Sequence, residues 1–139
     1  MQLTTILAAL AAAASVSAHF TVTTPPSRGF DELIEDQAPC GGFNTPSTTR
    51  TTFGKDSNVT IRLADDSATT TVRIGYGSNP KKFKSLVGSA SFTSKGVYNI
   101  PFNLHKVPRS QSGKPATVQI TISGDDGVLY QCSDVILKL

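Results

Sequence analysis

The sequence predicts an all-β protein: an antiparallel β-sandwich of the immunoglobulin or fibronectin kind with about seven strands, a long N-terminal loop and one disulfide. Two observations support this prediction. Apolar and polar residues alternate in several short segments, and no window of helical length keeps an apolar spacing of 3.6 residues. The alternating segments are residues 59–63, 72–76, 100–104 and 118–122, and each is predicted to be a strand with one face in a core.

Residues 1–18, "MQLTTILAALAAAASVSA", predict a secretory signal peptide. They carry no charge and end in Val16-Ser17-Ala18, which resembles an A-x-A cleavage site. Their apolar stretch is too short for a membrane span, and the residues after the last predicted strand lack the spacer and tail of a lipid-anchor signal. We therefore expect a secreted, extracellular protein with one domain, residues 19–139, and no membrane anchor.

Residues 23–53 are rich in proline and glycine and show little alternation, which predicts a long ordered loop. Cys40 lies in this loop, and Cys132 lies in the last predicted strand. The two cysteines of an exported chain form one disulfide by default, which would fasten the loop to that strand.

Residues 116–137 predict a closing β-hairpin, because the strand of 118–122 runs through "SGDDG" into a second apolar segment. Asp126 lies in the turn of this hairpin, where an Asp-Gly pair also suits the backbone alone. Asp134 shares its alternation phase with Tyr130 and Cys132 and is predicted to point inward. A buried carboxylate needs a hydrogen-bond donor, so its expected role is structural.

The net charge of +3 comes from basic residues spread along the chain, with one cluster at Lys81, Lys82 and Lys84. This distribution, without an Arg-rich or aromatic-interleaved run, predicts no nucleic-acid partner. We interpret the cluster as a solvated loop, while contact with an anionic wall or membrane surface stays open. One sequon, Asn58-Val59-Thr60, predicts glycosylation of Asn58.

His19 would be the first residue after cleavage. A histidine there offers one metal ion both its α-amine and an imidazole nitrogen, a chelate that suits Cu(II). Metal binding would displace the proton of the α-amine, so the affinity would depend on pH. Taken alone, a histidine at this position can also occur by chance.

Further residues carry a resemblance to a known family. "HFTVTTPPSRGFDELIEDQAPCGGFN" at the mature start and "GDDGVLYQCSD" near the end resemble the fungal copper acquisition factors, exported proteins similar in shape to lytic polysaccharide monooxygenases. The resemblance implies that the amine and imidazole of His19 form half of a histidine brace for Cu(II). It also implies an oxygen ligand from Asp126, in place of the tyrosine of the monooxygenases, and the disulfide between Cys40 and Cys132.

The sequence departs from the family pattern at the second brace histidine. That residue is expected after the strand of 59–63, where the chain reads "RLADDSATTTV" and places Asp65 and Asp66. A carboxylate ligand lowers the preference for copper over harder cations. An ordinary turn role for the two aspartates stays open. His105 is the only other histidine, and we expect it to be a loop residue without a role at the site.

The resemblance thus implies a secreted, monomeric, non-catalytic copper-binding protein that acquires or transfers copper at the cell surface. The cell wall or a copper transporter would be its further partner. The alternative is a β-sandwich module for surface or cell-wall interaction that has lost the metal. We expect no enzyme, because half a brace lacks the geometry for oxygen activation, the chain has no Trp, and no Ser-His-Asp triad has a recognisable context.

Overall fold

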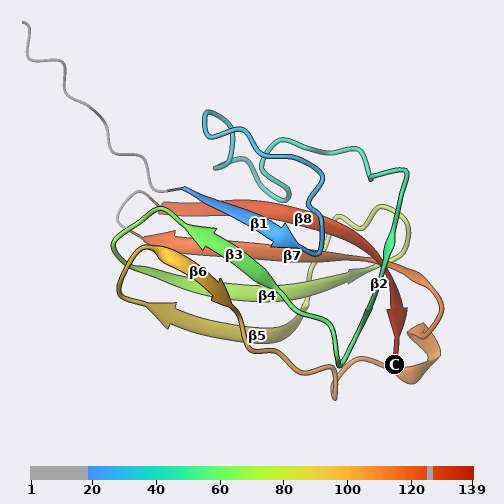
Figure 1. Ribbon diagram of the computed structural model, residues 1–139. Coiled ribbons are helices and arrows are strands. Elements are labelled where there is room, and N and C mark those ends of the chain that lie inside the picture. Colours follow the sequence, from blue (N-terminus) through green and yellow to red (C-terminus); the bar gives the residue numbers. More distant parts are fainter. Residues whose placement is uncertain (1–18, 125–126) are drawn as a thin grey trace, which may run out of the picture.

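A computed structural model describes residues 19–124 and 127–139, so the predicted signal peptide and Asp126 lie outside the described residues. The described strands form two packed sheets (Figure 1). One sheet has the order β1-β3-β6 and the other β2-β8-β7-β4-β5. The elements are β1 Phe20–Thr24, β2 Thr51–Gly54, β3 Thr60–Leu63, β4 Ala68–Tyr76, β5 Ser85–Phe92, β6 Gly96–Asn99, the short 3-10 helix η1 Arg109–Gln111, β7 Pro115–Gly124 and β8 Gly127–Lys138.

The β-sandwich and the closing hairpin of β7 and β8 are confirmed, with two differences. First, β2 pairs in parallel with β8, so the larger sheet is mixed rather than antiparallel. Second, the prediction of a strand at residues 100–104 is wrong, since β6 ends at Asn99 and only an isolated bridge joins Phe102 to Gly88. Pro101 lacks a backbone N–H inside that segment and cannot donate to a ladder.

The core lies between the two sheets. Alternate residues of each central strand point into it, as the period of two predicts. Phe102 packs on this core from its extended loop, where its ring stacks on Phe53 with centroids 4.9 Å apart. This explains why its segment alternates like a strand. Fully buried core residues include Phe20, Ile61, Val72, Ile74, Val118, Ile120, Ile122 and Val135.

The long loop between β1 and β2 covers the outer face of β8, where Figure 1 shows it in cyan. Cys40 of this loop forms the predicted disulfide with Cys132, with Cα atoms 5.1 Å apart. Leu129, Val135 and Leu137 of β8 belong to the sandwich core, whereas Cys132 is buried beneath the loop. β8 is therefore buried on both faces.

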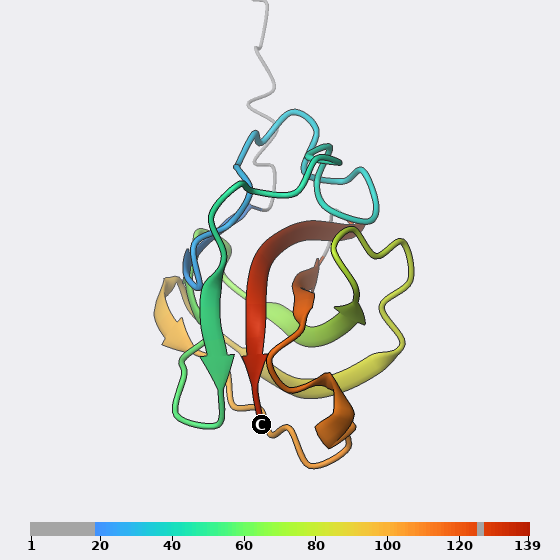
Figure 2. The same cartoon turned by 90° about the vertical axis from the view of Figure 1, so that its right-hand side faces the viewer.

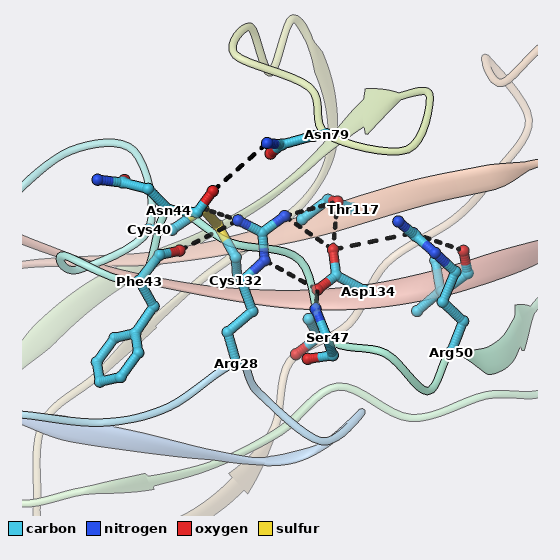
Figure 3. A network of polar contacts seen from close by, with 12 residues as sticks. Arg28, Cys40, Phe43, Asn44, Ser47, Arg50, Asn79, Thr117, Cys132 and Asp134 are labelled. Atoms are coloured by element: carbon cyan, nitrogen blue, oxygen red, sulfur yellow. Dashed lines mark hydrogen bonds and ion pairs between the residues drawn. A yellow bond between two sulfur atoms is a disulfide. The ribbon is translucent and has the colours of Figure 1, made fainter.

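A buried ion pair anchors the same loop (Figure 3). The carboxylate of Asp134 accepts hydrogen bonds from Arg28 Nε and Nη2, both at 2.8 Å, and from Ser47 N–H and Thr117 Oγ1, both at 2.7 Å. The Arg28 and Asp134 side chains are 3% and 0% exposed. Burial alone would raise the pKa of Asp134, but the hydrogen bonds from Arg28, Ser47 and Thr117 together lower it below its ordinary value. The prediction that Asp134 is buried and finds donors is confirmed, and its side chain faces the long loop on the outer side of β8 rather than the sandwich core.

Candidate metal site

His19 lies at the start of β1, at one end of the sandwich. The antiparallel register of β1 and β3 sets Phe20 opposite Leu63, and the next N–H of the chain, that of Ala64, donates to the carbonyl oxygen of His19 at 3.1 Å. The turn between β3 and β4 therefore begins directly beside His19. On its other side the His19 ring lies near Phe30 of the long loop, with centroids 6.3 Å apart.

The two aspartates of that turn, Asp65 and Asp66, have different surroundings. Asp66 has a side chain that is 96% exposed, and its Oδ1 lies 3.9 Å from Nζ of Lys95. Asp65 is only half-buried, and its Oδ2 would lie 3.6 Å from a methyl group placed on Gly124, the last residue of β7. Asp65 thus faces the end of β7 at Gly124, whereas Asp66 faces solvent and Lys95.

Glu35 of the long loop is a buried acid at this end, which sequence reasoning missed. The residue is only 2% exposed. Its Oε1 accepts a hydrogen bond from Nε2 of Gln131 at 2.9 Å. Its Oε2 is buried and has no hydrogen-bond partner among the described residues. The same Gln131 amide donates to the Phe20 carbonyl and accepts from Val22 N–H, so it joins Glu35 to β1.

Burial raises the pKa of Glu35 to about 7. Hydrogen bonds from Gln131 and from the backbone of Phe20 oppose this rise, as does the charge of His19, while the charge of Asp65 adds to it. The carboxyl group of Glu35 is therefore in electrostatic contact with both His19 and Asp65. These three side chains come from the start of β1, the long loop and the β3–β4 turn.

Acids in a loop are normally solvated, and Asp31, Glu32 and Asp36 are exposed, whereas Glu35 is buried. Nothing in "DELIED" distinguishes Glu35 from its neighbours. The only signal was indirect: Cys40 follows five residues later and holds this segment against β8, where Tyr130 N–H donates to the Glu35 carbonyl.

The remaining predicted residues lie elsewhere. His105 is exposed in the loop after β6, at the opposite end of the sandwich, so it does not approach His19. Asn58 is exposed between β2 and β3, where a glycan would have room, and its glycosylation stays a prediction. Among the described residues, no three His, Cys, Asp or Glu side chains already form a metal-binding cluster. The backbone bond of Ala64 to His19 places Asp65 in the turn beside His19, so the candidate donors here are the nitrogens of His19 and the oxygens of Asp65, a mixed nitrogen and oxygen set.

The fold and this end of the molecule define a class: a disulfide-bonded β-sandwich with a histidine at the start of its first strand. A solved structure, LPMO10B from Micromonospora aurantiaca, aligns with a TM-score of 0.50 and 18% identity over 70% of this chain and 63% of that one, a likeness of fold alone. Residues 17–138 match the family described as copper acquisition factor BIM1-like, and the chain belongs to this family.

Two curated relatives agree with that membership. Copper acquisition factor BIM1 of Cryptococcus neoformans var. grubii is 36% identical over 133 residues, which cover 86% of this chain and 60% of the relative. Lytic polysaccharide monooxygenase-like protein X325 of Yarrowia lipolytica is 32% identical over 141 residues, which cover 92% of this chain and 53% of the relative. The chain thus spans little more than half the length of these relatives.

The helical content is small. In residues 19–124 and 127–139 the one helix is η1, with three residues, and no helix there is long and apolar enough to cross a membrane.

Proposed function

We propose that this chain is a secreted, non-catalytic copper-binding protein that captures Cu(II) outside the cell and passes it on at the cell surface. The observation that carries this proposal is the β1–β3 pairing, which sets His19 beside the Asp65 turn in a chain of the copper acquisition factor family. The cell wall or a copper transporter would receive or retain the protein, which would act as a monomer.

In this proposal the ion is cargo, and the residues of the chain supply its ligands. Removal of residues 1–18 would free the α-amine of His19 next to its imidazole. Asp65 would supply a carboxylate oxygen where the family pattern places the second imidazole, and Asp126 would supply another. Asp66 is the weaker candidate, since its carboxylate is exposed and lies near Lys95.

The local environment supports a cation at this position. The buried Oε2 of Glu35 has no donor among the described residues, and the carboxyl groups of Glu35 and Asp65 repel each other. A positive charge near His19 would relieve that repulsion. Nitrogen and oxygen donors together fit Cu(II), although fewer imidazoles mean weaker selection for copper than a complete brace provides.

The first test is isothermal titration of the processed protein with Cu(II). A variant extended by one residue before His19 loses the amine donor, and Asp65→Asn loses the carboxylate. We expect each to weaken binding by at least about tenfold, the equivalent of about 1.4 kcal/mol. Asp66→Asn is the matched control and should bind like the native protein. Equal affinity of the native and the extended protein would contradict the proposal.

The missing second histidine supports the alternative function, a surface interaction module without a metal. Asp65→His distinguishes the two, because it restores an imidazole at the position nearest His19. Tight Cu(II) binding by Asp65→His but not by the native protein would establish the alternative. The intact mass of the exported protein, with and without Cu(II), reports the cleavage site, any glycan on Asn58 and the bound ion together.

A further inference from the structure

The strand directions gather several chain segments at the end of the sandwich opposite His19. β2 and β8 both finish at this end, β6 finishes there, and β7 starts there. It is the right-hand end of Figure 1 and faces the viewer in Figure 2. Three of these segments, residues 54–59, 99–115 and 138–139, border one groove, and we call them the basic end. The β4–β5 loop also starts at this end, where Gly77 N–H donates to the Pro115 carbonyl.

Charge is divided between the two ends. The basic end carries five exposed Lys and Arg side chains and one Asp, whereas the end at His19 carries Asp65, Asp66 and the loop acids, with Lys95 beside Asp66. None of these five bases forms an ion pair within residues 19–124 and 127–139. Their charges are therefore available to a partner. The five are Lys55, Lys106, Arg109, Lys114 and Lys138, and the acid is Asp56.

Three of the five bases, Lys55, Arg109 and Lys138, line a groove of about 610 Å³. Asp56 also lines it, as does His105, which the metal site does not use. Phe102, Leu104 and Val107 give it an apolar part, and Ser57 and Asn103 add polar groups. The volume is in the range of ligand-binding clefts, and the mixture of one apolar wall with a few polar groups is typical of them.

We propose that this groove binds an acidic polysaccharide, a chain of sugars that carry carboxylates. The bases complement the carboxylates, the hydroxyl and amide groups match sugar hydroxyls, and the apolar wall accepts the face of a sugar ring. A membrane fits less well, because the large exposed apolar side chains Phe30, Leu33, Val97 and Val128 lie outside the basic end and Leu86 lies in β5. A single-stranded nucleic acid would need several stacking platforms, whereas Phe102 is the one Phe, Tyr or Trp side chain among the described residues that line the groove.

Binding through the basic end would leave His19 directed away from the polysaccharide and toward the medium. This orientation rests on the proposed function, but the polysaccharide site does not, and its test uses metal-free protein. Failure of the polysaccharide test would therefore leave the copper proposal standing, and failure of the copper test would leave this one standing.

The experiment is an anisotropy titration of labelled polygalacturonate with metal-free protein. We expect saturable binding that weakens as salt rises from about 50 to about 200 mM, because salt screens charges at a protein surface. The triple variant Lys55→Glu, Arg109→Glu, Lys138→Glu should bind at least about tenfold more weakly. All three side chains are exposed, so the fold should persist, which circular dichroism and a thermal melt would verify.

The matched control reverses the same number of charges on side chains that do not line the groove. Lys81→Glu, Lys82→Glu, Lys84→Glu changes the exposed β4–β5 loop, where Lys81 lines a separate hollow with Thr121 and Tyr130. At about 150 mM salt the Debye length is about 8 Å, so this variant should lose less than about threefold. Equal losses in the two triple variants would overturn the proposal. So would equal binding of fully methyl-esterified polygalacturonate, or tighter binding to phosphatidylserine vesicles.

Discussion

The ion pair between Arg28 and Asp134 holds the long loop on β8, and Asp134→Asn is the sharpest perturbation of it. The substitution keeps the size of the side chain and removes its charge. Oδ1 of the new asparagine can still accept from Thr117 or Ser47, but Arg28, with a side chain 3% exposed, loses its counter-charge. Arg50 Nη1, 3.8 Å from the carboxylate, would lose attraction as well.

The expected loss follows from that burial. Removing one partner of a buried ion pair costs about 3 to 5 kcal/mol, because the other charge stays buried without compensation. Urea slopes for small proteins are about 1 to 3 kcal/mol per M. With a slope of about 2, the urea midpoint should fall by about 1.5 to 2.5 M. This is a large share of a typical domain stability of about 5 to 15 kcal/mol.

The assay is urea unfolding followed by circular dichroism, from neutral pH down to about pH 3. The folded pKa of Asp134 is lowered from its ordinary value of 3.8, so the unfolded state takes up the proton first as the pH falls. The contribution of Asp134 is therefore complete above the unfolded value and is lost as the pH falls through the folded one. The stability gap between native protein and Asp134→Asn should be constant near neutral pH and narrow below about pH 4.

A control separates the charge from the packing. Arg28→Met combined with Asp134→Leu removes both charges, and it should recover at least half of the loss, since apolar replacement of a buried pair is often neutral. A loss below about 1 kcal/mol for Asp134→Asn, or a gap that keeps its size at acid pH, would refute the reasoning.

Two further predictions concern the same loop. Replacing Cys40 and Cys132 by alanine removes a disulfide of sequence separation 92 and should lower the free energy of unfolding in urea by about 4 to 5 kcal/mol. An unchanged urea midpoint would show that the disulfide contributes nothing to stability. Glu35 has a pKa raised to about 7 from 4.5, so its protonated form stabilises the fold below pH 4.5, and this contribution is lost as the pH rises through 7. The melting temperature of metal-free Glu35→Gln should therefore rise relative to that of the native protein as the pH increases from about 5 to about 8. A melting-temperature difference that is the same at both of these pH values would contradict this.

Local pattern was enough to predict the elements with one buried face. β4 and β7 alternate cleanly because their outer faces carry threonine and glutamine. β5, "SLVGSASF", at the edge of its sheet, was not predicted because Ser, Gly and Ala occupy five of its eight positions and leave little apolar alternation. The parallel pairing of β2 with β8 could not be predicted from the sequence either, because it joins residues more than eighty positions apart in the chain and depends on where the long loop returns to the sheet.

The burial of Glu35 shows a different limit. An acid in a loop is normally solvated, and its burial here depends on three distant partners: the Cys132 end of the disulfide, the Gln131 amide and the Phe20 backbone. Asp134 could be predicted because it lies in a regular strand, where the period of two assigns each residue to a face. A loop has no such period, so its inward residues appear only when the tertiary contacts are known.

At the candidate site, the choice between Asp65 and Asp66 likewise depends on tertiary contacts. The two residues are adjacent, chemically identical and equally suited to a turn, so the sequence leaves them equal. The β1–β3 register separates them: Ala64 bonds to His19, Asp65 then lies toward Gly124 and Glu35, and Asp66 turns toward Lys95. A module that has lost its metal has no need of a carboxylate at position 65 in particular. For such a module Asp65→Asn and Asp66→Asn would be equally silent toward Cu(II), whereas a copper binder must be sensitive to the first alone.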